Sequence, residues 1–314
     1  MSRGGASHRR AVLQALFVTF LWSTSWVLIK IGLREIPALG FAGLRYGLAF
    51  LMLLPVVLRR PDLRAALAGL ERADWLRLGA LGLVFYLATQ GAQFVALAHL
   101  PAVAVSLALS LTPAVVAFGG VPLLGERPAG TQWLGLALAL GGAALYFLPV
   151  TVPLHPIGLA AAGVGLLANA GGTLLGRGVN RERRLHPLVV TVVSMGVGAA
   201  GLVLAGLATE GAPRLGPAGW LIVLWLAAVN TAFAFTLWNR TLERLSATES
   251  SVLNNTMLVQ IAVLAWLFLG ESLAARQVAG ILLAGVGALL VQLGSGRAKI
   301  PDREPPGGDE APGS

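Results

Sequence analysis

The sequence predicts an all-α polytopic membrane protein with ten transmembrane helices, arranged as two inverted five-helix repeats. Three observations predict this: an apolar composition, an alternating distribution of Lys and Arg, and a repeat of 145 residues. The chain is 56% hydrophobic and 12% charged, whereas a soluble domain carries about 25% charged residues. Such a composition is typical of a chain whose segments lie in lipid.

Ten apolar segments, most of them separated by prolines, have about the length that a helix needs to cross about 30 Å of hydrocarbon. The first follows Arg9 and Arg10 and lacks a clear small-residue cleavage site, so we expect a retained span and not a signal peptide. Strands of a membrane barrel would alternate over about ten residues, which does not fit. The expected spans are 11–31, 39–58, 75–98, 101–124, 131–149, 156–178, 187–207, 218–240, 247–269 and 277–293.

The basic residues predict that both termini are cytoplasmic. If the tail at residues 1–10 is cytoplasmic, 18 of the 23 Lys and Arg fall in cytoplasmic segments and span ends, four fall outside, and Arg45 lies within a span. Cytoplasmic loops carry such an excess. We therefore expect a multi-pass protein of the cell membrane, in contact with membrane lipids. A disordered Pro/Gly-rich tail is expected over residues 294–314.

One segment occurs twice. The sequence "LLGERPAGTQWLGLALALGGAAL" at 123–145 recurs as "FLGESLAARQVAGILLAGVGALL" at 268–290, with 11 of 23 positions identical. The chain therefore divides into two halves of five spans, residues 11–149 and 156–293. Because five is odd, the second half enters the membrane in the opposite orientation, which is the architecture of many secondary transporters.

The residue types and motifs that the chain lacks argue against several kinds of function. It has no cysteine, all of its Asp and His residues fall in loops or tails, and neither HExxH nor GxSxG occurs. We therefore expect no enzyme, no cofactor and no metal site. The net charge of +9 is explained by basic loops facing anionic lipid headgroups, so nucleic acid is not an expected partner.

Three motifs resemble a known family. The patterns "LWSTSWVLIKIGL" in the first span, "AGLRYGLAF" in the second, and "LGE" closing the fourth and ninth are similar to those of the drug/metabolite transporter superfamily, EamA type. The resemblance covers roughly residues 11 to 293. It implies a ten-helix carrier with a central cavity lined mainly by helices 1, 3, 4, 6, 8 and 9. It also implies export, import or exchange of amino acids and other metabolites.

Polar and aromatic residues near the middle of the spans are the candidates for contact with a small-molecule substrate. An uncharged cavity rich in hydroxyls and amides suits a zwitterion or a neutral metabolite. The alternative for each residue is an ordinary hydrogen bond between helices, worth about 0.6 kcal/mol. The candidates are Trp22, Ser25, Trp26, Tyr86, Gln90, Ser110, Asn169, Asn230, Trp238 and Asn254.

Charged residues at the rims suggest gates. Under the predicted topology, Glu126 and Arg177 lie at the cytoplasmic rim, and Glu271 and Lys30 lie at the outer rim. We expect the pairs Glu126–Arg177 and Glu271–Lys30 to close one mouth each. The alternative is that both acids are static caps or anchors at the headgroup level, because rim ion pairs often contribute little.

Arg45 is charged and lies inside the second expected span, about six residues from its start. It can bind a substrate carboxylate or phosphate, or it can extend to the interface or pair with Glu271 or Glu35. The sequence favours the structural role, because a long Arg near a helix end usually reaches the interface.

Stripes of small residues run along the fifth and tenth spans, beginning at Gly135 and Gly280. Such stripes let two helices approach closely. Packing within one chain is the simpler interpretation, and a homodimer through the stripes is the alternative.

The sequence thus predicts a secondary transporter that exports an amino acid or a related small metabolite by alternating access. The cargo and the direction of transport rest on the resemblance. Three alternatives stay open: a multidrug exporter, a membrane enzyme, and a lipid scramblase that uses the same cavity.

Overall fold

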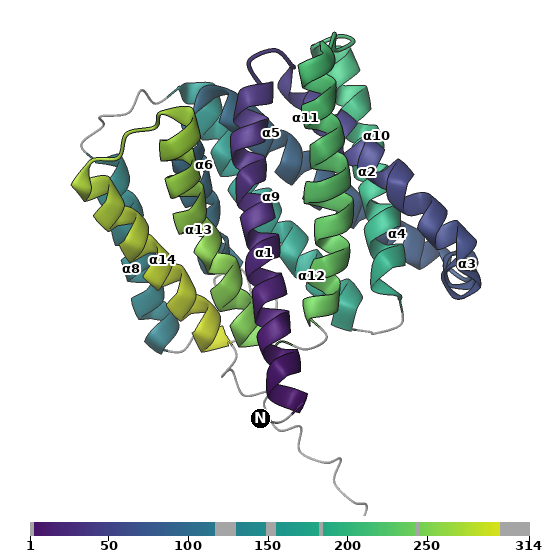
Figure 1. Cartoon of the computed structure of the whole chain (residues 1–314), viewed down its shortest axis with the longest axis horizontal. Coiled ribbons are helices and arrows are strands. Elements are labelled where there is room, and N and C mark those ends of the chain that lie inside the picture. Colours follow the sequence, from purple (N-terminus) through teal and green to yellow (C-terminus); the bar gives the residue numbers. More distant parts are fainter. Residues whose placement is uncertain are drawn as a thin grey trace, which may run out of the picture.

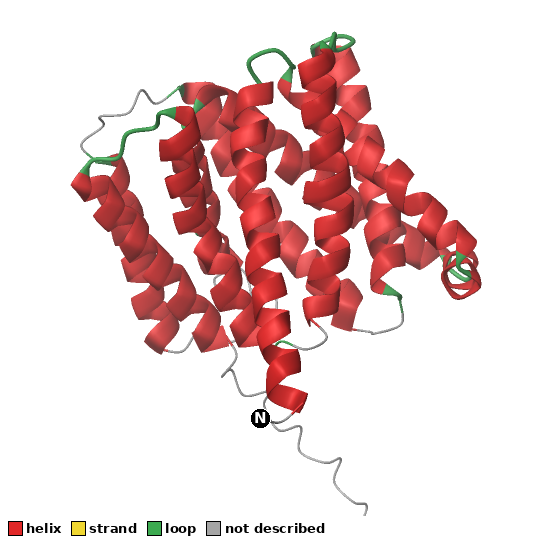
Figure 2. Cartoon of the chain, in the orientation of Figure 1, coloured by secondary structure: helices red, strands yellow, loops and turns green. Residues whose placement is uncertain are grey.

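Figure 1 presents the computed structural model of the chain, in which residues 3–116, 130–148, 155–181, 185–242, 245 and 247–295 are described. Throughout these ranges the regular secondary structure is helical and no strand occurs (Figure 2). The helices form one bundle. We call the end at which α1 begins the first face, and the end at which α1 stops and α2 begins the second face. Figure 2 shows the described turns at 33–37, 210–216 and 270–274 on the second face.

The helices of the first half cover its first, second, third and fifth expected spans and part of the fourth. The third span is one continuous helical path made of three consecutive elements. The elements are α1 (Arg3–Gly32), α2 (Ala38–Arg59), α3 (Pro61–Ala68), α4 (Arg72–Leu81), η1 (Gly82–Gln90), α5 (Gly91–His99), α6 (Ala102–Ser110) and α8 (Gly130–Phe147). Because α1 begins at Arg3, most of the expected N-terminal tail is helical.

The second half repeats this organisation. The eighth expected span of the chain, at 218–240, is again a path of three consecutive helical elements. The elements are α9 (Pro156–Arg181), α10 (Pro187–Thr209), α11 (Pro217–Ala227), η2 (Ala228–Phe233), α12 (Ala234–Leu242), α13 (Ala247–Leu269) and α14 (Ala275–Ser295).

Eight stretches of the described chain are long and apolar enough to cross a membrane. Two expected spans are not among them. For the span at 101–124, the described helix is the shorter Ala102–Val116, and 117–129 lies outside the described residues. For the span at 131–149, the chain forms α8, whose 18 residues include the polar Thr131 and Gln132 near its start. The count of ten transmembrane helices stays a prediction.

Two π-helices, η1 and η2, occur at matching places in the halves, since Gly82 and Ala228 lie 146 residues apart. In each, a threonine hydroxyl donates to the carbonyl five residues earlier: Thr89 to Val84 at 2.9 Å and Thr231 to Leu226 at 2.8 Å. These bonds satisfy carbonyls that a regular α-helical ladder would use. Such π-helical turns occur frequently at functional sites. Residues of η1 line the cavity described below, and α12, which directly follows η2, also lines it.

The last helices of the two halves, α8 and α14, lie side by side at one edge of the bundle (Figure 1). A Cβ on Gly135 would stand 2.7 Å from the carbonyl oxygen of Gly287, and one on Gly280 would stand 2.7 Å from that of Gly142. The two small-residue stripes therefore pack on one another within the chain, and their close approach needs no second copy. The homodimer stays a prediction that one chain does not test.

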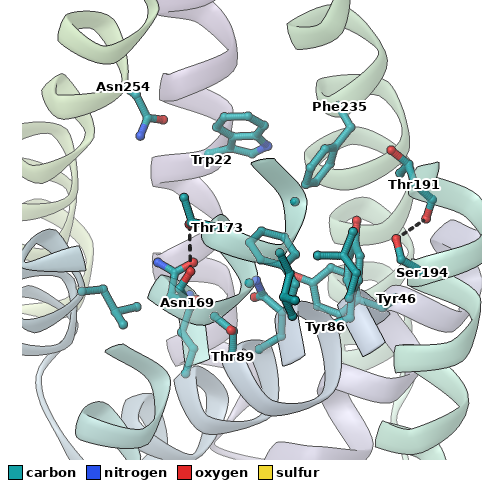
Figure 3. Close-up of a pocket in the computed structure, with 18 of the residues that line it drawn as sticks. Trp22, Tyr46, Tyr86, Thr89, Asn169, Thr173, Thr191, Ser194, Phe235 and Asn254 are labelled. Carbon is teal, nitrogen blue, oxygen red and sulfur yellow. Dashed lines mark hydrogen bonds between the residues drawn. The ribbon is translucent and has the colours of Figure 1, made fainter. Parts of the chain in front are cut away.

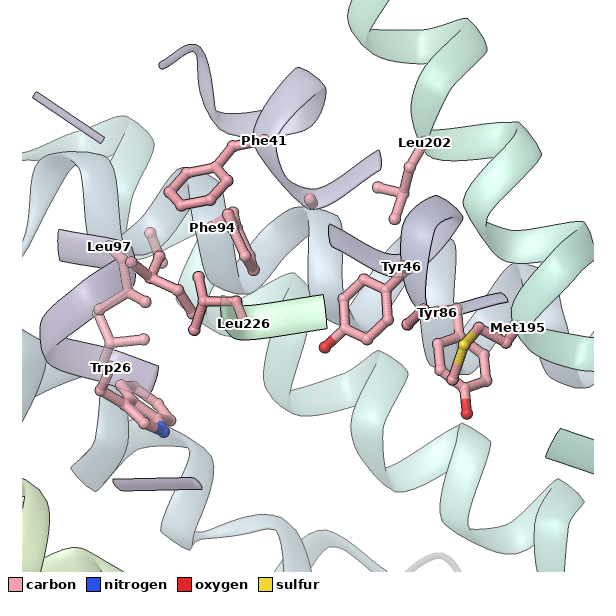
Figure 4. Close-up of a cluster of buried hydrophobic side chains, with 14 of the residues drawn as sticks. Trp26, Phe41, Tyr46, Tyr86, Phe94, Leu97, Met195, Leu202 and Leu226 are labelled. Carbon is pink, nitrogen blue, oxygen red and sulfur yellow. The ribbon is translucent and has the colours of Figure 1, made fainter. Parts of the chain in front are cut away.

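A cluster of fully buried side chains fills the bundle between its middle and the second face. We call Phe41, Phe94, Leu97 and Leu226 the apolar plug; each is 0% exposed. Figure 4 shows them gathered from α2, α5 and α11. The rings of Phe41 and Phe94 meet edge to face, with centroids 5.2 Å apart. This dry packing separates the middle of the bundle from the second face.

Candidate functional site

A cavity of about 1790 Å³ occupies the middle of the bundle. It is larger than the roughly 300–1,000 Å³ of ordinary ligand pockets. Residues from α1, α2, the α4–η1–α5 path, α6, α9, α10, α12 and α13 line it, and none comes from α8 or α14 among the described residues. Helices of both halves therefore share one space, which is where a bundle places ligand sites.

Nine of the ten predicted substrate contacts line this cavity, and Asn230 does not. They are Trp22, Ser25, Trp26, Tyr86, Gln90, Ser110, Asn169, Trp238 and Asn254. Asn230 is 0% exposed, and its amide nitrogen donates to the carbonyl of Leu21 and, at 3.2 Å, to the hydroxyl of Thr24. It joins η2 to α1. Substrate contact by the nine residues stays a prediction.

The exposure of the lining shows where the cavity opens. Leu76, in the first turns of α4, is 69% exposed, and Leu175, in the last turns of α9, is 41% exposed. Tyr86 and Ser106, deep in the wall, are 4% and 5% exposed. No lining residue comes from the described turns of the second face. The cavity therefore opens at the first face and ends at the apolar plug.

Aromatic rings form much of the wall. Trp22 packs against Phe235 and Trp238, with centroids 5.4 and 5.2 Å away, and Tyr46 packs against Tyr86 at 5.5 Å. Figure 3 shows Trp22 and Phe235 in its upper part and Tyr46 and Tyr86 in its lower part. Such surfaces suit the apolar part of a small molecule.

Polar groups lie between these rings. The amide nitrogen of Asn169 donates to the hydroxyl of Thr112 at 3.0 Å, and the hydroxyl of Ser110 donates to the carbonyl of Leu107 at 2.7 Å. Within the described part of the chain, the amides of Gln90 and Asn254 have no hydrogen-bond partner. Gln90 and Asn254 therefore keep both donors and acceptors for a ligand or for water.

Four polar or aromatic lining residues from α2 and α10 are not among the ten predicted substrate contacts: Arg45, Tyr46, Thr191 and Ser194. The family resemblance implies a lining formed mainly by other helices. Arg45 is 5% exposed and its Nε donates to the hydroxyl of Thr231 at 3.1 Å, so it lies in the wall and does not extend to the interface. The signal that could have indicated it is the charge itself, which is costly inside a span unless it has a function or a partner.

The predicted outer pair, Lys30 and Glu271, lies at the closed end of the bundle and does not form a direct ion pair there. The ammonium of Lys30 donates to the carbonyls of Leu97 at 2.6 Å and Leu100 at 2.7 Å, where α5 ends. One oxygen of Glu271 accepts the backbone N–H of Ala102 at 2.7 Å, and the other accepts that of Val103 at 3.2 Å, where α6 begins. A cation at a helix C-terminus and an anion at an N-terminus are both favourable.

Both charges therefore bind the same turn, which we call the α5–α6 corner (residues 97–103). Lys30 ties it to α1, and Glu271 ties it to the connection between α13 and α14. The other predicted pair cannot be placed in the same way. Glu126 lies outside the described residues, and so does the side chain of Arg177.

Comparison with known proteins identifies the family to which this helical bundle belongs. A family model described as the EamA-like transporter family matches residues 9–148 and again residues 156–293. The chain belongs to the EamA-like transporter family. Membership in this family points to a membrane transporter rather than to an enzyme. Each half matches the family model separately.

Two relatives of this EamA-like transporter cover nearly its full length. An uncharacterized protein of Pseudomonas aeruginosa is 30% identical over 286 residues, which are 85% of this chain and 89% of that protein. A Salmonella typhimurium protein named "Probable amino-acid metabolite efflux pump" is 27% identical over 288 residues, which are 87% and 91% of the two chains. A solved crystal structure superposes with a TM-score of 0.65 at 20% identity, over 90% of this chain and 98% of that one, and shares its fold.

Proposed function

We propose that this EamA-like transporter exports an amino acid or a related small metabolite across the cell membrane by alternating access. The observation that carries the proposal is the cavity, which reaches the middle of the bundle from the first face and ends at the apolar plug. With both termini cytoplasmic, as the basic residues predict, the first face receives cargo from the cytoplasm. The name of the Salmonella relative supports the same class of cargo.

The proposal includes two inverted repeats of five helices. Three observations support it: the separate match of each half to the family model, the pairing of α8 with α14, and the matching positions of η1 and η2. Inverted repeats place the substrate near the midplane between the halves. Movement of one repeat against the other can then open the same site first to one side of the membrane and then to the other.

The gate at the second face, in this proposal, is the α5–α6 corner together with Lys30 and Glu271. Their four hydrogen bonds hold the corner against α1 and against the α13–α14 connection. Hydrogen bonds to charged groups contribute about 1.5–3 kcal/mol each. For the cavity to open outward, these bonds and the apolar plug must both give way. The static-cap alternative uses the same bonds but requires that they persist in every state.

The function is tested by solute counterflow. Purified protein is screened by thermal shift against amino acids, purines, sugars and cationic dyes, and stabilising compounds are loaded into proteoliposomes. Saturable counterflow of a labelled amino acid or related metabolite, absent from protein-free liposomes, is the expected result. Stabilisation and counterflow by lipophilic cations alone would replace the proposal with a multidrug exporter. Transfer of labelled lipid between leaflets without solute counterflow would replace it with a scramblase.

A further inference from the structure

Arg45 is a buried charge whose position in the bundle the proposed transport function does not by itself explain. It lies in α2, in the deep wall of the cavity, and its side chain is only 5% exposed. Its guanidinium carbon stands 5.1 Å from the centre of the Tyr46 ring. In the part of the chain that the structure describes, no carboxylate forms an ion pair with it. A buried charge without a counter-charge is costly and needs another explanation.

Counting donors shows how much of this guanidinium is unused. Nε donates to the hydroxyl of Thr231 at 3.1 Å, and that hydroxyl donates its own hydrogen to the carbonyl of Leu226 at 2.8 Å. The two terminal nitrogens carry the other four N–H groups and form no hydrogen bond with the described residues. They are also not among the fully enclosed polar atoms that lack a partner. Their N–H groups are therefore accessible from the cavity.

The charges of the wall all have one sign. Among the described lining residues, Arg45 and Arg77 are charged, and neither Asp nor Glu occurs. A cavity with low-dielectric walls strengthens the attraction of such charges for an anion and their repulsion of a cation. The ammonium group of a zwitterion would find only neutral acceptors there, such as the amide oxygens of Asn169 and Gln90.

We propose that Arg45 binds the carboxylate of the transported molecule, so that the cavity favours small organic anions over zwitterions, and zwitterions over cations. This rests on the proposed transport function and narrows its cargo to carboxylates whose amino group is absent or acylated. The planar guanidinium donates two parallel hydrogen bonds to a carboxylate, a geometry that an ammonium group does not offer. The bond to Thr231 fixes the direction in which the two terminal nitrogens point. The aromatic walls take the apolar part of the molecule.

Three probes with one side chain and different charges test this. N-acetylphenylalanine is an anion, phenylalanine is a zwitterion, and phenylalanine methyl ester is a cation. Their dissociation constants are measured by titration calorimetry on the full chain in detergent, and each is then tested in counterflow. We expect affinity to fall in the order given. We expect Arg45→Gln to weaken binding of the anion by about 10- to 100-fold, the range for losing hydrogen bonds to a charged group.

Two further variants distinguish the loss of direct contact between Arg45 and the anion from a loss of folding and from a change in net charge. Arg45→Lys keeps the charge but loses the paired donors, so it should bind the anion more weakly than wild type and more tightly than Arg45→Gln. Arg64→Gln removes one positive charge from an exposed site outside the cavity, and its affinity should stay within about twofold of wild type. Size-exclusion profiles identify a variant that does not fold. If Arg45→Gln does not fold, the Arg45→Lys comparison decides.

The outcomes distinguish the two proposals. If solutes are transported but the ester binds as tightly as the anion, or Arg45→Gln and Arg45→Lys bind like wild type, the assignment of Arg45 is wrong while the transport function stands. If no probe binds and no solute of the wider screen shows saturable counterflow, both proposals are wrong. The expected order of affinities, lost in Arg45→Gln, supports both.

Discussion

Toward the first face the cavity is bordered by exposed side chains such as Leu76 and Leu175, whereas toward the second face it ends at Phe41 and Phe94, which are fully buried. The closed end adds two charged side chains, and both of them bind backbone atoms of the α5–α6 corner. Closure of the cavity at the second face therefore combines two kinds of interaction. Dry packing excludes solvent, and charge-assisted hydrogen bonds fix the position of the corner.

The largest effect is expected from opening the apolar plug. Phe94→Ala should lower the free energy of unfolding by about 3–5 kcal/mol, because it leaves a cavity among buried rings. Thermal or denaturant unfolding in detergent measures this. The matched control is Phe233→Ala, since Phe233 is 50% exposed on η2 and its loss should cost less than about 1 kcal/mol. Equal losses in the two variants would mean that the plug contributes no special packing.

Removing one charge at the closed end should have a smaller effect on stability and a clear effect on accessibility. Glu271→Gln keeps one acceptor oxygen but loses the charge that favours the start of α6, which should cost about 1–3 kcal/mol. A cysteine placed at Leu97 reports opening, because the native chain has none. We expect faster labelling from the second face in proteoliposomes. Glu35→Gln, an exposed acid on the same face, is the control, and equal labelling in both variants would support the static cap.

The shared corner predicts that Lys30 and Glu271 act together. In a double-mutant cycle, Lys30→Met and Glu271→Gln should be non-additive by about 0.5–1.5 kcal/mol, because either change alone already loosens the α5–α6 corner. The cycle is measured by unfolding of the two single variants and the double variant. Strict additivity would show that the two side chains hold the corner independently.

The smallest effect on stability is expected at the open end. Leu76→Cys changes an exposed side chain and should shift the free energy of unfolding by less than about 0.5 kcal/mol, while its thiol reacts quickly with a charged maleimide. Leu97→Cys makes the same substitution at a fully buried site and should react far more slowly. Similar rates at the two cysteines would show that the plug does not close the cavity.

Much of the lining could be predicted from the sequence, because polar and aromatic residues stand out in apolar spans. Nine selected residues do line the cavity. Asn230 is equally polar, but the neighbouring helix α1 satisfies its amide nitrogen, and sequence spacing does not say which neighbour a side chain meets. Arg45 was placed at the interface by a general tendency of arginine. Its burial depends on the position of Thr231, 186 residues away.

The helical paths were predictable and their irregular turns were not. The apolar periods at 75–98 and 218–240 indicate two continuous helices, and the structure has them with π-helical segments inside. A π-helical turn shifts the side-chain faces only locally, so it leaves little trace in hydropathy. Lys30 and Glu271 meet through the α5–α6 corner and not directly, because backbone groups at a turn compete for charged side chains and do not show in the sequence. Their role as a gate stays a prediction.

The seam between α8 and α14 joins the final helix of one half to the final helix of the other, yet no described residue of either helix reaches the cavity. The residues that line the cavity and the glycines that form the seam therefore belong to separate parts of the sequence. Changes along Gly135 and Gly280 should alter how much folded protein reaches the membrane and leave its choice of solute intact. In a library of variants scored for both abundance and substrate preference, changes at the seam should lower abundance alone, and changes in the cavity lining should alter substrate preference.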